Sequence, residues 1–510
     1  MPAGSPFLRE SSGLVKQVGL LDAVMFNFGN MSAGLALFTS ISPYISRGGV
    51  LWLASLIAMA LSLPQLYLYT RLMEKIPRTG GDYIWLSRIL YGPLGFAFAL
   101  AFMIEATAYF ALVAFFSASS INAVLSTIGA VDRAASYTAL ADSVFVDPYG
   151  APTLAQRLLF YGVAAAAFAL IIGVNIARPK WGYKLVTGLG LFSTAATALA
   201  MVVLALGAGA FSESIRPLLQ QAASSSPGGS PWPQAFSFTA TLAMIPLFAL
   251  YTYPWLTAAP SAAAEIRGQK ALKHNLWIAY VLTAAFVTLG FLELDLIAGY
   301  NFNINAYSTF VYNFWTAAMA VAGNIVLQWL IGLGLIAWNF FVLAYGVITF
   351  SRYIFAMAFD RIMPEIFARL NKAGSPAYTH LLDLALTLAL LAIPVFSVGA
   401  AVSLYGAIIV AAIYFTAVGL AGLVLGLRSG ERGLAAAGAL TSAYFAWLTY
   451  VSATNPIFGF VEGNGQPNPV TLVFVLVSFL AGIPIYLISW SRHRKMGLDV
   501  NAAFREIPPE

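Results

Sequence analysis

Cysteine and charge are what this sequence lacks. None of its 510 residues is cysteine, which excludes disulfide bonds, thiolate metal sites and cysteine nucleophiles. Charged residues make up 9% of the chain, whereas a typical soluble protein carries about 25%. A chain with so few charges cannot cover a large surface in contact with water. Its net charge of +6 is small and dispersed, so we expect no nucleic-acid partner.

Long apolar segments take up most of the chain. Hydrophobic residues make up 60% of it, and the mean hydropathy is +0.81. A helix needs about 20 mostly apolar residues to cross a bilayer. The sequence therefore predicts an all-α polytopic membrane protein with twelve transmembrane helices, over residues 19–43, 49–71, 93–125, 155–176, 183–208, 236–263, 276–298, 323–358, 378–397, 399–427, 434–454 and 469–490.

The basic residues predict the orientation in the membrane. An even number of helices places both termini on one side. With the termini in the cytoplasm, all but four of the 26 Lys and Arg lie at the cytoplasmic face, where such residues are enriched; the four are Arg47, Arg133, Arg157 and Arg216. We therefore expect a multi-pass protein of the cell (cytoplasmic) membrane. Residues 1–18 and 491–510 are then cytoplasmic, and we expect the second segment to have little fold of its own.

Two of the apolar segments are interrupted. Phe26–Phe38 reads FNFGNMSAGLALF, with glycine and polar residues where a continuous helix is expected, and the sixth segment contains Pro246, Pro254 and Pro260. Backbone without helical hydrogen bonds survives at membrane depth only where it lines a cavity or is buried in protein. Prolines alone often do no more than kink a helix. Interruptions in segments one and six, however, are typical of an inverted five-plus-five repeat with a substrate site between them.

Three stretches near predicted helix ends share a further pattern. Residues 76–96 read IPRTGGDYIWLSRILYGPLGF, residues 351–376 read SRYIFAMAFDRIMPEIFARLNKAGSP, and segment six ends in Glu265-Ile266-Arg267. Together they resemble the amino acid–polyamine–organocation (APC) superfamily of permeases. The resemblance implies a LeuT-like 5+5 inverted repeat with broken helices one and six. It also implies a secondary active transporter of amino acids that works by alternating access, and not an enzyme.

The resemblance also divides the chain. It implies a transporter core of ten helices in two inverted repeats over residues 19–427, followed by two additional helices over residues 428–490. Arg352 and Asp360 bracket the inner end of segment eight, where they can pair and reach the lipid headgroups.

The two interruptions supply candidate substrate-binding residues. A half-helix that begins near Ser32, Ala33 and Gly34 would direct unpaired N–H groups at an α-carboxylate, and the glycine would let the backbone approach closely. Carbonyls at the preceding helix ends would accept hydrogen bonds from the ammonium group. Phe248 resembles the gating aromatic residue of the superfamily. The predicted binding residues are Asn30, Ser32, Ala33, Gly34, Phe248, Ala249, Leu250, Tyr251 and Thr252.

Glu105 is interpreted as the one acidic residue deep inside a predicted span. Because a charge at mid-bilayer costs about 3 kcal/mol or more, such a residue is a functional candidate. It could carry a proton, balance a cationic substrate, or act as a protonated structural hydrogen-bond donor. We expect H⁺ as the coupling ion, through Glu105. The alternative is Na⁺, bound by Thr194, Thr197 and Asn339.

Other functions are weighed against this one. Within the same class are a sodium-coupled symporter and an amine or polyamine exchanger, of which the exchanger would require further acidic groups. A nutrient sensor on the same scaffold is an alternative of another class. An enzyme is disfavoured, because His274, His380 and His493 fall at predicted cytoplasmic edges without acidic partners at metal-ligand spacing. We expect no cofactor, no firmly assigned metal, a small-molecule amino acid substrate, the lipid bilayer as surroundings, and a monomer or homodimer.

Overall fold

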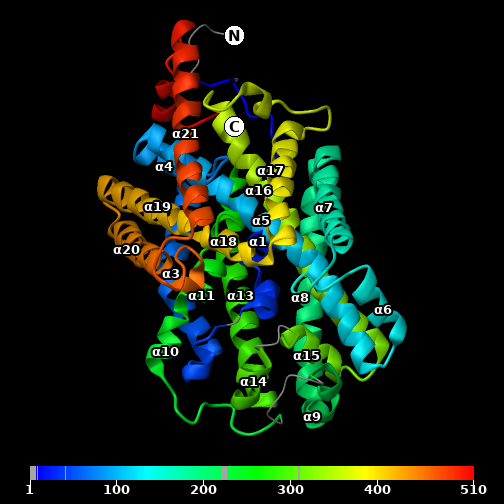
Figure 1. Ribbon diagram of the computed structural model, residues 1–510. Helices are drawn as coiled ribbons and strands as arrows, with labels where there is room; N and C mark the ends of the chain where they lie inside the picture. The colour runs from blue at the N-terminus through cyan, green and yellow to red at the C-terminus, as the bar shows by residue number, and fades with distance from the viewer. Residues whose placement is uncertain (1–6, 9, 41, 220–226, 308–310, 510) are drawn as a thin grey trace.

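The fold is built from helices. The computed structural model describes residues 7–8, 10–40, 42–219, 227–307 and 311–509, and within these ranges every regular element is helical (Figure 1). The prediction of an all-α polytopic protein is therefore confirmed.

Eleven helices in the described ranges are long and apolar enough to cross a membrane. They are α1 with α2 (Leu20–Met31 and Ala33–Thr39), α3 (Leu51–Lys75), α5 (Gly92–Val131), α7 (Leu154–Ala177), α8 (Pro179–Leu206), α13 (Gln269–Ala298), α16 (Ile325–Phe359), α17 (Ala377–Phe396), α18 with α19 (Val398–Gly406 and Ile408–Ser429), α20 (Arg432–Thr454) and α21 (Pro469–Lys495).

The sixth predicted segment differs from the others. Residues 236–263 form three short helices, α10 (Phe238–Ala243), α11 (Ile245–Tyr251) and α12 (Ala258–Ser261). The predicted count of twelve transmembrane helices is thus not confirmed, because the interruptions predicted for this segment leave it without one long helix. The inverted repeat stays a prediction.

Shorter helices occupy the connections. They are α4 (Asp82–Ile89), α6 (Ala135–Ser143), α9 (Phe211–Ser214), α14 (Tyr300–Ala306), α15 (Phe314–Val321) and, among the 3₁₀ turns, η7 (Pro456–Phe458) and η8 (Val500–Arg505).

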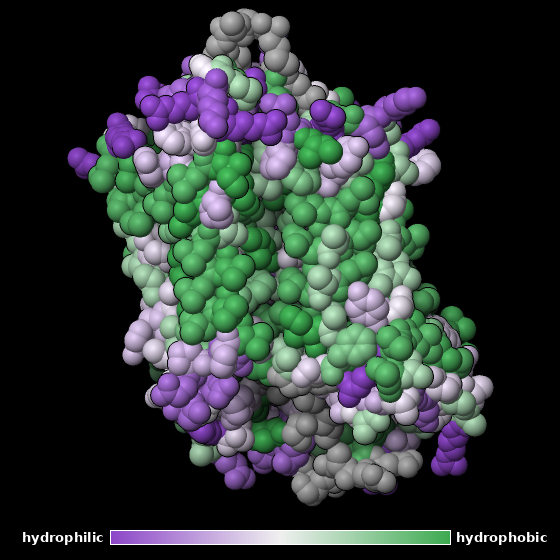
Figure 2. Space-filling view, turned by 45° about the horizontal axis from the view of Figure 1, so that its top comes forward, coloured by the Kyte–Doolittle hydropathy of each residue, from purple (hydrophilic) through white to green (hydrophobic). Residues whose placement is uncertain are grey.

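The helices form a buried centre and an apolar periphery. Most residues of α1, α2, α5 and α16 are buried, whereas only a minority of the residues of α7 and α21 are. The exposed side chains of α21 include Leu476, Leu480 and Leu487. Figure 2 shows a broad hydrophobic belt between two polar zones. An apolar surface of this extent is stable only in contact with lipid or another apolar partner, as expected for a multi-pass membrane protein.

The first and the last described residues lie at one face, which we call the terminal face (Figure 1). The Leu8 amide donates to the Phe359 carbonyl (3.1 Å), and Arg78 Nε donates to the Pro508 carbonyl (2.9 Å). The expectation of a tail with little fold is wrong, because η8 packs against the helices. The Phe504 side chain is buried beside Gly92, where the absence of a Cβ leaves room for the ring.

Candidate functional site

The first helix breaks at Ser32, between α1 and α2. Ser32 has φ 48° and ψ 53°, the left-handed conformation that a residue with a side chain rarely adopts. Its N–H donates to the Phe28 and Gly29 carbonyls (3.1 Å each), which closes the end of α1. Its hydroxyl lies 3.3 Å from the Tyr109 hydroxyl. The predicted interruption is confirmed, and serine occupies the strained position.

The second break follows α11. The Thr252 and Tyr253 amides both donate to the Phe248 carbonyl (3.0 Å each). The Pro254 carbonyl accepts from Gln65 Nε2 (3.0 Å), and the Leu250 carbonyl accepts from Trp255 Nε1 (3.0 Å). These bonds satisfy irregular backbone at membrane depth, as an environment without water requires. The Phe28, Gly29 and Leu250 carbonyls thus each accept a hydrogen bond from the protein at the breaks.

Polar side chains join the two broken segments. Asn30 Nδ2 donates to Thr257 Oγ1 (3.1 Å). Asn27 Oδ1 accepts from the Ala259 amide (3.1 Å), and Asn27 Nδ2 donates to Asn275 Oδ1 (2.7 Å). Segments one and six therefore lie side by side, as the pair of interruptions predicts.

A cavity of about 380 Å³ begins at these breaks. At one end it is lined by Ser32, Glu105, Tyr109 and Thr252, and it extends toward Tyr149 and the η7 loop, on the side opposite the terminal face. Its full lining is Ser32, Leu35, Ala36, Thr39, Ser40, Glu105, Tyr109, Leu112, Phe116, Tyr149, Leu247, Tyr251, Thr252, Ala401, Val402, Leu404, Tyr405, Ile408, Ile457 and Phe458. The volume lies within the range of about 300–1,000 Å³ that is usual for small-molecule sites.

The cavity contains some of the predicted residues and not others. Ser32, Tyr251, Thr252 and Glu105 line it, whereas Asn30, Ala33, Gly34, Phe248, Ala249 and Leu250 lie outside its lining. The buried Phe248 ring packs edge-on against Phe291, with 6.0 Å between ring centroids. Its proposed gating role stays a prediction.

Gly34 has a structural reason to be glycine. A Cβ at this position would lie 2.3 Å from Trp338 Cδ1. The Gly34 carbonyl accepts from Trp315 Nε1 (2.9 Å). The close approach that the sequence suggested thus occurs, but between the backbone and tryptophan side chains.

Two residues of the predicted sodium site, Thr197 and Asn339, do not face each other. Thr197 accepts from Trp338 Nε1 (2.9 Å) and lies between α8 and α16. Asn339 follows Trp338, about 100° further around the helix. Seven residues to either side of it, Gly332 and Gly346 face α5, where the Val124 and Phe110 side chains lie. This places Asn339 on the α5 side of α16, away from Thr197.

Thr194 and Thr197 also have local partners. Their hydroxyls donate to the carbonyls of Gly190 (2.6 Å) and Ser193 (2.7 Å) within α8. This pairing is usual for threonine within a helix. Neither bond requires a cation.

In the described part of the chain, three acidic residues are buried inside spanning helices: Glu105 in α5, Asp383 in α17, and Asp295 close to the end of α13. Glu105 is 3% exposed, and its Oε2 has no hydrogen-bond partner among the described residues. Asp383 is fully buried in α17 and accepts from Thr387 Oγ1 (3.1 Å). The interpretation of Glu105 as the single deep acidic residue is therefore wrong, and the sequence already showed Asp383 inside segment nine. His380, one turn before Asp383, is also buried, not at an exposed edge.

The terminal face is closed beneath the breaks by an ion pair. Arg352 donates to both carboxylate oxygens of Glu265 (2.6 and 3.1 Å), and both side chains are almost fully buried. The amides of Gln17 and Val18 donate to the Glu265 carbonyl (2.9 and 3.0 Å). The chain before α1 therefore covers the end of segment six.

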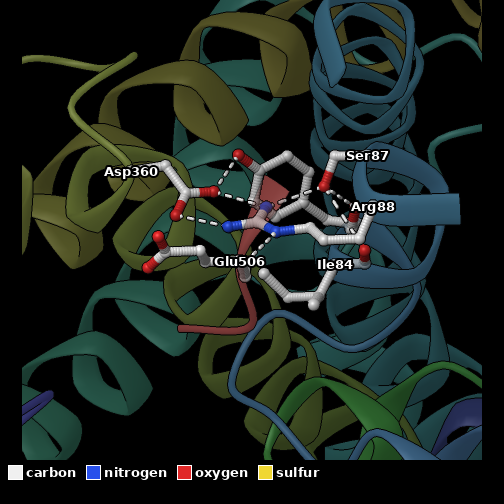
Figure 3. A network of polar contacts seen from close by, with 6 residues as sticks. Ile84, Ser87, Arg88, Asp360 and Glu506 are labelled. Carbon is white, nitrogen blue, oxygen red and sulfur yellow. Dashed lines mark hydrogen bonds and ion pairs between the residues drawn. The ribbon is translucent and has the colours of Figure 1, made fainter. Parts of the chain in front are cut away.

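A second ion pair joins α4 to the end of α16. Arg88 binds Asp360 with two parallel bonds, Nη1 to Oδ2 at 2.6 Å and Nη2 to Oδ1 at 2.7 Å (Figure 3). Tyr83 donates to the same carboxylate (2.6 Å), and Arg88 Nε reaches the Glu506 carbonyl (3.2 Å). The pairing of Arg352 with Asp360 that the sequence allows does not form, because each residue finds an opposite charge on another helix.

A family model for amino acid permeases matches residues 18–489. The chain belongs to this family. The resemblance to the APC superfamily is confirmed over nearly the whole sequence. No curated protein matches the chain. The protein is thus a multi-pass amino acid permease, whose substrate is a small molecule and whose surroundings are the lipid bilayer.

The permease buries a third acidic group at its terminal face, outside the spanning helices. Asp82, at the start of α4, accepts from the hydroxyls of Tyr69 (2.7 Å) and Tyr353. Burial raises the pKa of Asp82 to about 6, although the tyrosine hydrogen bonds act in the opposite direction. Preceding it, Gly80 and Gly81 have positive φ, and the Gly80 amide donates to the Ser261 carbonyl (2.8 Å). The turn formed by these two glycines therefore packs directly on α12.

Some residues that line the cavity were not predicted from the sequence. Tyr109 lies one helical turn after Glu105, and that spacing could have identified it. Tyr405 and Phe458 follow from no local pattern, since aromatic residues make up 14% of the chain. Their place in the permease cavity depends on how α18 and η7 pack against α11.

Proposed function

We propose that the permease is a secondary active transporter that moves amino acids across the cytoplasmic membrane by alternating access, driven by protons. The observation that supports this most directly is the cavity at the two helix breaks, which extends away from the terminal face while buried ion pairs close that face. With both termini in the cytoplasm, this arrangement is an outward-facing conformation. An inward-facing one would require the pairs of Glu265 and Asp360 to separate.

The substrate's polar end is placed at the breaks. Ser32, Tyr109 and Thr252 provide hydroxyl groups there, and Glu105 provides a carboxylate. A zwitterion needs donors for its carboxylate and acceptors for its ammonium group, and these side chains supply both. No cofactor is required by this scheme, and either a monomer or a homodimer would serve.

Proton coupling rests on Glu105. A buried carboxylate without a partner is unfavourable unless it holds a proton or a cation. A residue that lines the cavity while lacking a partner for Oε2 can take up a proton from one side and release it on the other. Sodium coupling is the alternative. It has less support, because Thr194 and Thr197 have local partners and Asn339 lies on another face of α16.

Uptake into proteoliposomes tests the proposal. A panel of labelled amino acids is presented with an imposed proton gradient, with a sodium gradient, and with neither. Accumulation driven by the proton gradient is expected. The proposal fails if no amino acid accumulates or exchanges under any gradient. Accumulation that needs only the sodium gradient would show that sodium, and not the proton, is the coupling ion.

The variant Glu105→Gln separates coupling from transport. Glutamine keeps the size of the side chain and cannot carry the proton, so proton-driven accumulation should be lost while exchange at equal concentrations continues. Glu293→Gln, the same change in the spanning helix α13 and outside the cavity lining, serves as a control for changes in membrane insertion. Unchanged accumulation in Glu105→Gln would give Glu105 a structural role.

A further inference from the structure

The cavity has a polar end and a long apolar end. Glu105, Tyr109, Leu112 and Phe116 follow one another on α5 at spacings of four, three and four residues, so they form one stripe. With 1.5 Å per residue, the stripe is about 16 Å long. The hydrogen bond between Tyr109 and Ser32 fixes the Glu105 end of the stripe at the first helix break. A substrate whose polar groups bind at the breaks therefore directs its side chain toward Phe116.

The apolar end carries no counter-charge. Among the described residues that line the cavity, Glu105 is the only charged one, and it lies at the opposite end. When the cavity closes around the substrate during alternating access, a lysine or arginine side chain in the apolar end would be desolvated without a carboxylate to pair with. An acidic side chain there would lack a cation. Burying an unpaired charge is strongly unfavourable. The cavity thus disfavours substrates with charged side chains.

Aromatic rings shape the apolar end. Tyr251 stacks on Phe458, with ring centroids 6.4 Å apart and an interplanar angle of 19°, and lies edge-on to Tyr405 at 6.0 Å. Phe116 lies 6.4 Å from Tyr405. These rings offer faces and edges to a further ring, the arrangement that aromatic pairs prefer. They come from α5, α11, α18 and η7, so a ligand there would contact four elements.

The volume fits a large side chain. A cavity of about 150 Å³ is enough to bind benzene. At about 380 Å³ this cavity holds an aromatic ring together with the backbone atoms of an amino acid. A glycine or alanine molecule would leave the apolar end without contacts to the rings, and so would lose most of the apolar burial.

We propose that the permease selects amino acids with bulky, uncharged, apolar side chains, aromatic ones above all, and that Phe116, Tyr251, Tyr405 and Phe458 form the side-chain subsite. This inference rests on the proposed function, since it takes the cavity as the substrate site. It adds the substrate class and the residues that determine it.

Binding to the full-length protein in lipid nanodiscs tests the proposal. Labelled phenylalanine, alanine, lysine and glutamate are each measured directly, and unlabelled tryptophan and leucine compete with phenylalanine. Phenylalanine, tryptophan and leucine should bind at least about tenfold more tightly than alanine, because a few methylene groups in an apolar pocket give discrimination of this size. Tighter binding of alanine, lysine or glutamate than of phenylalanine would overturn the proposal.

Substitutions locate the subsite. Phe458→Ala should reduce the preference for phenylalanine over alanine by about tenfold or more. Phe116→Leu should weaken the preference over alanine for aromatic substrates only. Phe479→Ala is the matched control, since this ring packs on Phe98 (5.6 Å) outside the cavity lining. An equal loss in Phe479→Ala, or an unchanged preference in Phe458→Ala, would contradict the assignment.

The subsite and the transport function would be refuted by different results. If another amino acid is bound and accumulated while phenylalanine is not, the subsite is wrong and the transport function stands. If no amino acid of the panel is bound or transported by folded protein, the proposed function fails and the subsite with it.

Discussion

Breaking the pair of Arg88 and Asp360 should open the terminal face. The side chains are 6% and 0% exposed, and two short parallel bonds join them. In Arg88→Ala the Asp360 carboxylate would remain buried, with Tyr83 as its only remaining partner in the described structure. Removing one member of a buried pair costs about 3–5 kcal/mol. If both residues reach water when the face opens, the open population should rise by about 10² to 10⁴ fold.

The absence of cysteine provides the assay. A single Ser261→Cys substitution places a thiol at a fully buried position of α12, beneath the turn before α4. Thiol labelling by a maleimide, with the protein in nanodiscs, then reports opening of the terminal face without background from other thiols. Adding Arg88→Ala should speed labelling, and Arg88→Lys should do so partially, since lysine cannot form two parallel bonds with one carboxylate.

A surface pair provides the control. Glu431 contacts Arg71 and Lys75 at the same face, but these side chains are about one-third exposed. Exposed pairs contribute little, so Glu431→Gln should leave the labelling rate unchanged. Equal labelling rates in Arg88→Ala and the parent, in protein that remains monodisperse, would refute the role of the buried pair as a lock.

Three further outcomes follow from the terminal face and the first break. Gly34→Ala should lower the thermal stability, because the added methyl overlaps Trp338 and overpacking costs about 1–3 kcal/mol; an unchanged Tm would contradict this. Burial raises the pKa of Asp82 to about 6, whereas the pKa of a solvated aspartate is about 4. Between these pH values Asp82 is protonated when the face is closed and ionised when the face is open. The free energy that favours the closed face over the open one should therefore fall by up to about 3 kcal/mol as pH rises from 4 to 6. Labelling at Ser261→Cys should increase over that range relative to the same protein carrying Asp82→Asn. Parallel pH profiles in the two proteins would exclude this titration. Deleting residues 499–510 should also increase that labelling, since the Phe504 ring and the Glu506 carbonyl leave Arg88; an unchanged rate would make the tail dispensable.

The sequence by itself determined the class of protein and the location of its irregular backbone. Low charge and long apolar segments leave no fold that is stable in water, so the membrane follows from composition. The breaks follow from local chemistry as well, since Pro254 removes a backbone donor from segment six. The motifs at residues 76–96 and 351–376 were sufficient to suggest the family. Each of these signals is a property of the composition or of one continuous stretch of sequence and needs no tertiary contact.

Only the tertiary structure decided which side chains meet. Arg88 and Asp360 are 272 residues apart, and nothing local distinguishes that pairing from one of Arg352 with Asp360. The cavity wall likewise combines Glu105 with Tyr405 and Phe458 from distant elements. Asn339 was grouped with Thr197 by residue type, but its direction is set by how α16 packs between α5 and α8. Side-chain direction depends on helix packing, which is a property of the whole chain.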